Sequence, residues 1–190
     1  MTTELEERLR VTLNDGSAAV LEAGVLDDDA IDAFLNGQCH ALAVLLAEHL
    51  GAPLAVVADG RALEALDEEA GGGGQLSDRA FRDSWLHVVV ELEDGLFLDA
   101  SGLHDGAHLI QLCLAERPSD GVIARTTREQ VLAILSAEGT NAVTADWAAA
   151  AAFIDSVIDE YLVTGAEGPG LTTDDERPVH GSNARTVCTY

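Results

Sequence analysis

The stretch NGQCHALAVLLAEHLGAPLAVV, residues 36–57, places a helix directly before a strand. The apolar positions that recur with helical spacing are Leu42, Leu45, Leu46 and Leu50. They predict a helix over 38–50, and Gly51 suits a left-handed residue at its end. PLAVVAD, residues 53–59, follows as a strand. Because Asn36-Gly37 breaks the chain just upstream, Cys39 is expected in the first turn of the helix.

Further along, WLHVVVELEDGLFLDASG, residues 85–102, predicts two strands around a turn. A three-residue loop at 93–95, with Gly95 left-handed, pairs Leu92 with Leu96 and buries one continuous apolar face. A two-residue loop would instead place His87 and Asp99 on opposite faces. The favoured register makes these two residues diagonal neighbours, within reach of a hydrogen bond. On the same reading, Trp85 shares the face of His87.

Cys39, His87 and Asp99 together suggest an activated cysteine nucleophile. A thiol in the first turn of a helix lies at the positive end of the helix dipole, which favours the thiolate. His87, oriented by Asp99, would then act as general base and acid for Cys39. The side chain of Gln38 and the backbone N–H of Cys39 could donate to an oxyanion. The competing interpretation of Cys39 is a packing role, because free cysteines are among the most buried residues.

The order GQC, then LGAPLAVV, then HVVVELEDGLFLDASG resembles the transglutaminase-like branch of the papain-like cysteine enzymes over roughly residues 36–102. The resemblance implies Cys39 as nucleophile, His87 as general base and acid, and Asp99 as the residue that orients it. Two features depart from the family pattern: Val88 follows the histidine, and Ala100-Ser101-Gly102 follows the aspartate. Arylamine N-acetyltransferases share the Cys, His, Asp order. Their Arg-Gly-Gly stretch before the cysteine is missing here, so coenzyme A has little support.

Outside this region the sequence predicts further helices and one strand. Helices are expected at 3–13 and 17–24, joined by a turn at Asn14-Asp15-Gly16, and again at 27–35, 127–139 and 144–163. Residues 120–126 suit a short strand. Residues 59–84, with four consecutive glycines, are predicted to form a mobile excursion, and 67–76 would be a lid if it lies near Cys39.

Composition limits the class of protein. The chain has 190 residues, 47% of them hydrophobic, which fits one domain over 1–163 and a C-terminal tail over 164–190, either flexible or docked by its apolar end. Its 34 acidic and 10 basic residues give a net charge of −24, which argues against nucleic acid as a partner. No secretory leader or long apolar run is apparent, so a cytoplasmic protein is expected, with no membrane partner. Three widely spaced cysteines make no disulfide framework.

Other candidate residues have simpler interpretations. His104 and His108 are spaced as two metal ligands on one helix face, but zinc sites need three or four convergent ligands. The sequence therefore predicts no metal and no cofactor. Cys113 is expected in the core. His40 and His49 are expected on the surface of the helix.

The sequence thus predicts an α+β fold with a papain-like core: a helix carrying Cys39, packed on a small, mostly antiparallel sheet that carries His87 and Asp99. The expected activity is that of a cysteine-dependent hydrolase or acyltransferase acting on an amide or ester bond. Its substrate would be a peptide, a protein or a small amide or ester, with Trp85 as an apolar wall. The alternative is a non-catalytic binding protein of the same fold.

Overall fold

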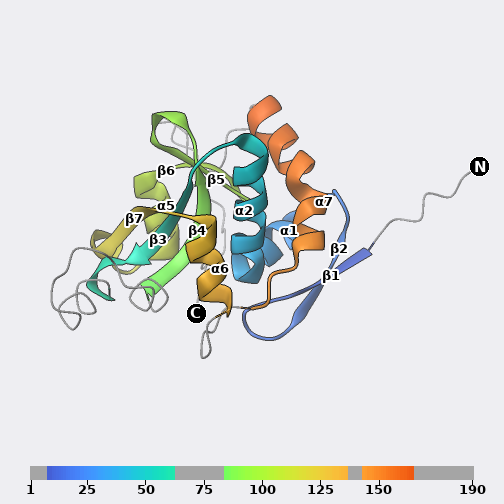
Figure 1. The fold of residues 1–190 in the computed structure, drawn as a ribbon, viewed down its shortest axis with the longest axis horizontal. Helices are drawn as coiled ribbons and strands as arrows, with labels where there is room; N and C mark the ends of the chain where they lie inside the picture. The colour runs from blue at the N-terminus through green and yellow to red at the C-terminus, as the bar shows by residue number, and fades with distance from the viewer. Residues whose placement is uncertain (1–7, 63–83, 137–142, 165–190) are drawn as a thin grey trace, which may run out of the picture.

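The computed structural model describes residues 8–62, 84–136 and 143–164 of the chain. It is an α+β protein, as predicted (Figure 1). In chain order the elements are β1 (Arg8–Thr12), β2 (Ala18–Glu22), α1 (Asp28–Ala33), η1 (Phe34–Gln38), α2 (Cys39–Leu50), β3 (Leu54–Asp59), β4 (Trp85–Glu91), η2 (Glu93–Gly95), β5 (Leu96–Asp99), β6 (Gly102–Asp105), α5 (Gly106–Cys113), η3 (Pro118–Asp120), β7 (Gly121–Thr126), α6 (Arg128–Ser136), α7 (Trp147–Ile158) and η4 (Asp159–Val163).

The central sheet is antiparallel, with strand order β6-β5-β4-β3-β7. Figure 1 shows α2 between this sheet and α7. The larger core joins α2 and α7 to one face of the sheet, and Phe34 meets Phe153 there at 5.1 Å between ring centroids. A smaller core lies on the other face, where Leu109 and Cys113 of α5 pack against β3, β4 and β5. Cys113 is therefore a core residue, as predicted.

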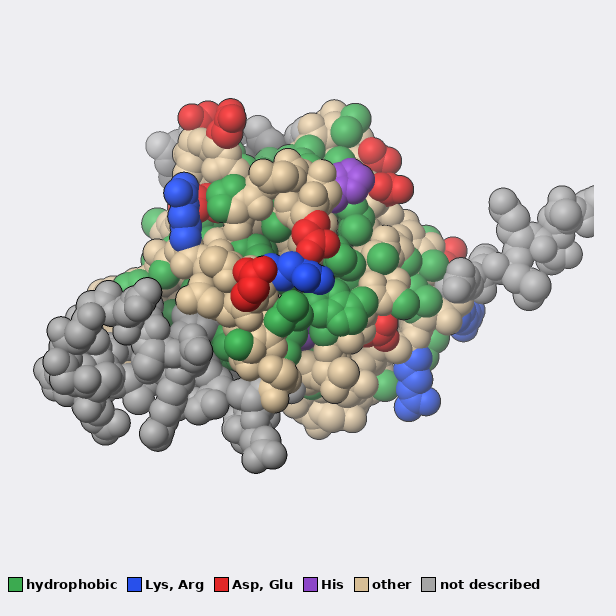
Figure 2. Space-filling model, viewed as in Figure 1, with side chains coloured by type: hydrophobic (Ala, Val, Ile, Leu, Met, Phe, Trp, Pro, Cys, Tyr) green, Lys and Arg blue, Asp and Glu red, His purple; other side chains and the backbone are tan. Residues whose placement is uncertain are grey.

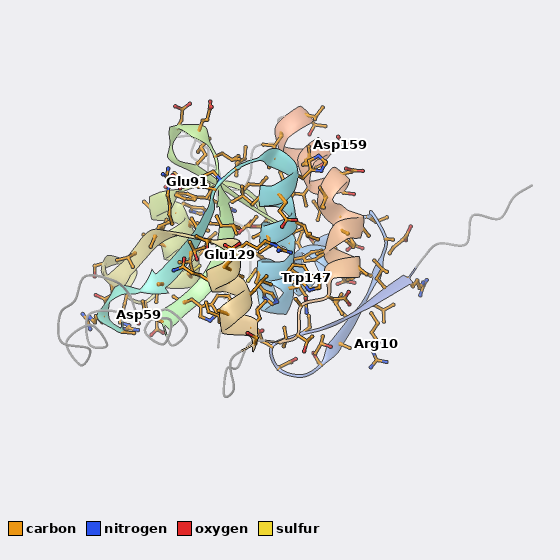
Figure 3. The ribbon with its side chains drawn as sticks, in the orientation of Figure 1. Arg10, Asp59, Glu91, Glu129, Trp147 and Asp159 are labelled. Carbon is orange, nitrogen blue, oxygen red and sulfur yellow. The ribbon has the colours of Figure 1, made fainter. Side chains whose placement is uncertain are left out.

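The predicted helices near the N-terminus are wrong where the structure describes them. Residues 8–12 and 18–22 form the antiparallel hairpin β1-β2, with Val11 and Leu21 as its buried side chains. Exposed and less exposed positions alternate along both strands, and Arg10 points away from the body of the protein in Figure 3. A turn such as Asn14-Asp15-Gly16 between two short alternating runs is a hairpin signal, and this signal outweighs helix propensity here.

The predicted β4-β5 register is confirmed. Val90 pairs with Leu98, and the N–H of Leu92 donates to the carbonyl of Leu96 at 2.8 Å. The loop has three residues and Gly95 is left-handed, with φ +74°. The two strands pair only at Val90 and Glu91, so the ladder stops before His87 and Asp99.

The faces predicted for Trp85 and Leu86 from regular alternation along β4 are both wrong. The β3-β4 ladder shifts after the pair of Val57 with His87, and the next pair joins Ala58 to Trp85. Leu86 is therefore an extra residue in β4, a β-bulge. The bulge turns Trp85 to the α2 side of the sheet, while Leu86 packs on the α5 side. The alternation that sequence reasoning applied to the whole strand holds only from His87 onward.

The helical stretch Asp28–Leu50, which includes the break at Asn36-Gly37, is long and apolar enough to cross a membrane by length and composition. However, 78% of its most apolar window is buried inside the protein, which is typical of a core helix.

On the face drawn in Figure 2 the arginine side chains are separate from one another and form no basic patch. The predicted lid at 67–76 and most of the predicted tail lie outside the described residues.

Candidate active site around Cys39

The backbone before Cys39 is a π turn with a local break. Asn36 and Gly37 in η1 depart from helical geometry, and α2 begins at Cys39, as the Asn-Gly pair predicted. Gly37 has φ +157°, and a β-carbon there would lie 3.1 Å from the carbonyl oxygen of Thr12. The N–H of Asn14 donates to the carbonyl of Asn36 at 2.9 Å. The β1-β2 hairpin therefore braces the chain directly upstream of the cysteine.

His87 and Asp99 meet as the hairpin register predicts. His87 Nε2 lies 2.9 Å from Asp99 Oδ2, with His87 fully buried and Asp99 5% exposed. The contact forms where the β4-β5 ladder has stopped, and both side chains line the same small cavity as Cys39. Because Nε2 is occupied by Asp99, Nδ1 is the ring nitrogen left for another partner.

That partner is Cys39. Burial by itself lowers the pKa of His87, but the charge of Cys39 and side-chain hydrogen bonds with Asp99 and Cys39 outweigh it and raise this pKa well above the ordinary 6.5. The imidazolium is thus favoured between a carboxylate on one side and a sulfur on the other. Such an arrangement can hold a thiolate-imidazolium pair, the reactive form of cysteine nucleophiles.

Asp99 has partners on its second oxygen as well. Oδ1 accepts from the N–H of Ser101 at 2.7 Å and from its hydroxyl at 2.7 Å, and lies 3.2 Å from His104 Nε2. Burial by itself raises the pKa of Asp99, but hydrogen bonds from His104 and His87 outweigh it and hold this pKa well below its ordinary range. The carboxylate therefore remains ionised in the protein interior.

Sequence reasoning did not assign Ser101 to the site and weighed His104 only as a metal ligand. One signal was available: an aspartate often accepts from the N–H two residues later, and Asp-Ala-Ser fits this turn. His104 gave no comparable signal, because β6 brings it back beside β5.

The side chain of Gln38 is occupied by structural contacts. Its Nε2 donates to the carbonyls of Thr12 at 2.9 Å and Thr144 at 3.2 Å, and its Oε1 accepts from the N–H of Asp146 at 2.8 Å. An amide nitrogen has two hydrogens, so no donor remains for an oxyanion. These contacts contradict the predicted oxyanion role of the side chain. Instead, Gln38 ties α2 to β1 and to the start of α7, the end marked by Trp147 in Figure 3.

Two other expectations fail because of burial. Trp85 is 7% exposed and meets the ring of His40 edge-on at 6.2 Å, so it is a core residue rather than an open substrate wall. His40 is 1% exposed, against the expectation of a surface position, and neither ring nitrogen has a hydrogen-bond partner within the described ranges. His49 is exposed, as predicted.

A cavity of about 10 Å³ lies between the three residues and apolar side chains of η1 and α2. This is about the space of one water molecule. Its walls are Phe34, Leu35, Cys39, Leu42, Ala43, Leu46, His87, Val88, Asp99 and Ala100. The described residues thus enclose Cys39, which is 4% exposed.

His104 and His108 do not share a helix. His104 lies on β6 and His108 in α5, with their rings stacked at 5.5 Å between centroids. Among the described residues, no group of three or more His, Cys, Asp or Glu side chains is placed to hold a metal ion.

Comparison of the chain with known protein families, with curated protein sequences and with solved structures gave no match.

Proposed function

We propose that this protein is a cysteine-dependent hydrolase or acyltransferase of papain-like, transglutaminase-like architecture. The observation that carries the proposal is the chain of contacts from Asp99 through His87 to Cys39. Asp99 lies on His87 Nε2 at 2.9 Å, and Cys39 interacts with the same ring. Three polar side chains, each at most 5% exposed, form this chain beside a cavity whose other walls are apolar. Burying such groups costs free energy, which a catalytic role explains.

The reaction follows from the positions of the groups. The Cys39 thiolate attacks the carbonyl carbon of an amide or ester, and the carbonyl oxygen takes the negative charge. His87 gives its Nδ1 proton to the departing amine or alcohol, which leaves a thioester on Cys39. Water or an amine then loses a proton to His87 and attacks the thioester, which releases the product and restores the thiolate. Asp99 keeps a hydrogen on Nε2 throughout, so that Nδ1 always faces the reaction.

The enclosed cavity limits the substrate. A carbonyl group can reach Cys39 only after the apolar side chains around the cavity move, since the present space holds about one water molecule. A peptide, protein or small amide substrate in the cytoplasm remains our proposal for the partner. The same enclosure favours the second candidate, a non-catalytic protein of this fold in which the three polar groups only stabilise one another.

Thiolate formation separates the two candidates without a known substrate. We would record the ultraviolet absorbance of the thiolate against pH for the wild type and subtract that of Cys39→Ser. The enzyme proposal predicts that Cys39 is a thiolate at neutral pH, which means that it ionises well below the ordinary cysteine pKa of about 8.5. Absence of a thiolate below about pH 8 would contradict it. Profiling with small acyl-donor probes, using Cys39→Ala as the blank, then tests acyl transfer itself.

A further inference from the structure

We propose that His104, together with Ser101, is a positioning residue of this site: it holds Asp99 with Oδ2 turned toward His87. This inference rests on the proposed function, because it concerns how Asp99 orients His87. It adds two residues on β6 and the preceding turn to the three that carry the chemistry.

Asp99 Oδ1 is surrounded by hydrogen-bond donors from Ser101 and His104. The backbone N–H of Ser101 can only donate, so Oδ1 must accept. The Ser101 hydroxyl lies 2.7 Å from the same oxygen, and its single hydrogen is best directed there. His104 Nε2 lies 3.0 Å from the Ser101 hydroxyl oxygen and 3.2 Å from Oδ1. With the serine hydrogen already used, His104 must supply a hydrogen from Nε2 to meet both oxygens.

The other nitrogen of the His104 ring, Nδ1, is buried and has no hydrogen-bond partner among the described residues. A neutral ring with its hydrogen on Nε2 leaves only a lone pair at Nδ1, whereas a protonated ring would bury an unpaired N–H beside the stacked ring of His108. The contacts therefore favour the His104 tautomer with its hydrogen on Nε2, which donates to Asp99.

In the part of the chain that the structure describes, the titratable groups that interact with Asp99 besides His104 are His87 on β4, Cys113 on α5 and Tyr161 on η4. Burial raises the pKa of Cys113 to about 11 and the pKa of Tyr161 to about 12, so both are neutral near pH 7. Asp99 therefore interacts with His87 through Oδ2, while Ser101 and His104 hold the carboxylate in place through Oδ1.

The geometry argues against a second nucleophile at Ser101. In serine triads the carboxylate binds the histidine nitrogen opposite the one that faces the serine. Here Asp99 and Ser101 meet the same nitrogen of His104. His104 cannot take a proton from Ser101 at a nitrogen that already carries one.

The test compares two substitutions at His104. His104→Phe keeps a planar ring but removes the donor, whereas His104→Gln keeps an N–H near the position of Nε2. The exposed His49→Phe, on α2, is the matched control. The readout is the thiolate absorbance against pH, because it depends on the interaction between His87 and Asp99. The thiolate-imidazolium pair exists between the pH at which the thiolate forms and the pH at which His87 loses its proton. We expect His104→Phe to shorten this interval by about one pH unit, which is a tenfold change in an equilibrium constant. His104→Gln should restore most of the range, and His49→Phe should match the wild type.

The outcomes are separable. A folded His104→Phe protein with the wild-type profile overturns the positioning role but leaves the proposed function intact. A wild type with no thiolate at neutral pH removes the proposed function itself. If His104→Phe does not fold, nitrogen NMR of wild-type histidines decides. A neutral His104 with its hydrogen on Nε2 supports the inference, and a hydrogen on Nδ1 overturns it.

Discussion

Asp99 Oδ2 lies 2.9 Å from His87 Nε2, and this contact determines which ring nitrogen of the histidine carries a hydrogen. An ionised carboxylate can only accept, so Nε2 must donate. Nδ1 can then exchange a proton with Cys39. The proposed chemistry therefore depends on the tautomer of His87, with its hydrogen on Nε2.

Asp99→Asn tests this control. The donors of Ser101 and His104 will hold the asparagine oxygen, so its NH₂ group must face His87. Nε2 then becomes an acceptor and the hydrogen moves to Nδ1, which can no longer take a proton from Cys39. We expect acyl-transfer rates to fall by about four orders of magnitude while the fold is retained. Circular dichroism and probe labelling measure the two effects, and full labelling of the variant would refute the tautomer argument.

Asp99 also predicts a pH dependence of stability. Its folded pKa is depressed, so its contribution to the free energy of unfolding is present above the unfolded pKa, about 3.9, and declines as the pH falls. The expected slope from this one carboxyl is about 1.4 kcal/mol per pH unit below about pH 4. Urea unfolding of the wild type and Asp99→Asn from pH 6 to pH 2.5 should show stability curves that converge in acid. Parallel curves would mean that Asp99 has an ordinary pKa.

Cysteine substitutions should separate the two buried thiols. Cys39→Ser keeps its shape and a hydrogen-bonding group beside His87, so we expect a melting temperature near wild type and complete loss of probe labelling. Cys113→Ser places a hydroxyl among the apolar residues of the α5 core and should cost about 1–3 kcal/mol, with labelling at Cys39 retained. Thermal unfolding and peptide mass spectrometry measure both. A large loss of stability in Cys39→Ser would favour the structural interpretation of the site.

Gln38→Ala tests the structural role that replaces the predicted oxyanion role. It removes the partners of two carbonyls and one N–H, so we expect a loss of about 3 kcal/mol. Gln111→Ala, at an exposed position of α5, is the control and should change stability by less than about 0.5 kcal/mol. Urea unfolding provides the comparison. Unchanged stability together with a reduced rate of acylation would indicate that Gln38 takes part in the reaction.

Much of the fold near the site could be predicted from local patterns. Helical spacing of leucines and the Asn-Gly break located α2 and placed Cys39 at its start. The position of Gly95 and the need to bury one continuous face fixed the β4-β5 register, and His87 meets Asp99 just beyond the paired residues. These features depend on residues close together in sequence, where periodicity and turn geometry act directly.

The remainder depends on contacts between distant residues. Gln38 meets the carbonyl of Thr144 and the N–H of Asp146, and nothing near residue 38 signals those partners. The bulge at Leu86 reverses the face of Trp85, and β6 carries His104 onto Asp99. The sequence determined which polar side chains the fold could bring together, because the placement of Cys39, His87 and Asp99 follows from one helix and one hairpin. Only the tertiary structure decided that these residues are enclosed and that Asp99 is held from both sides. Burial and the second set of partners come from elements whose approach is set by packing of the whole core.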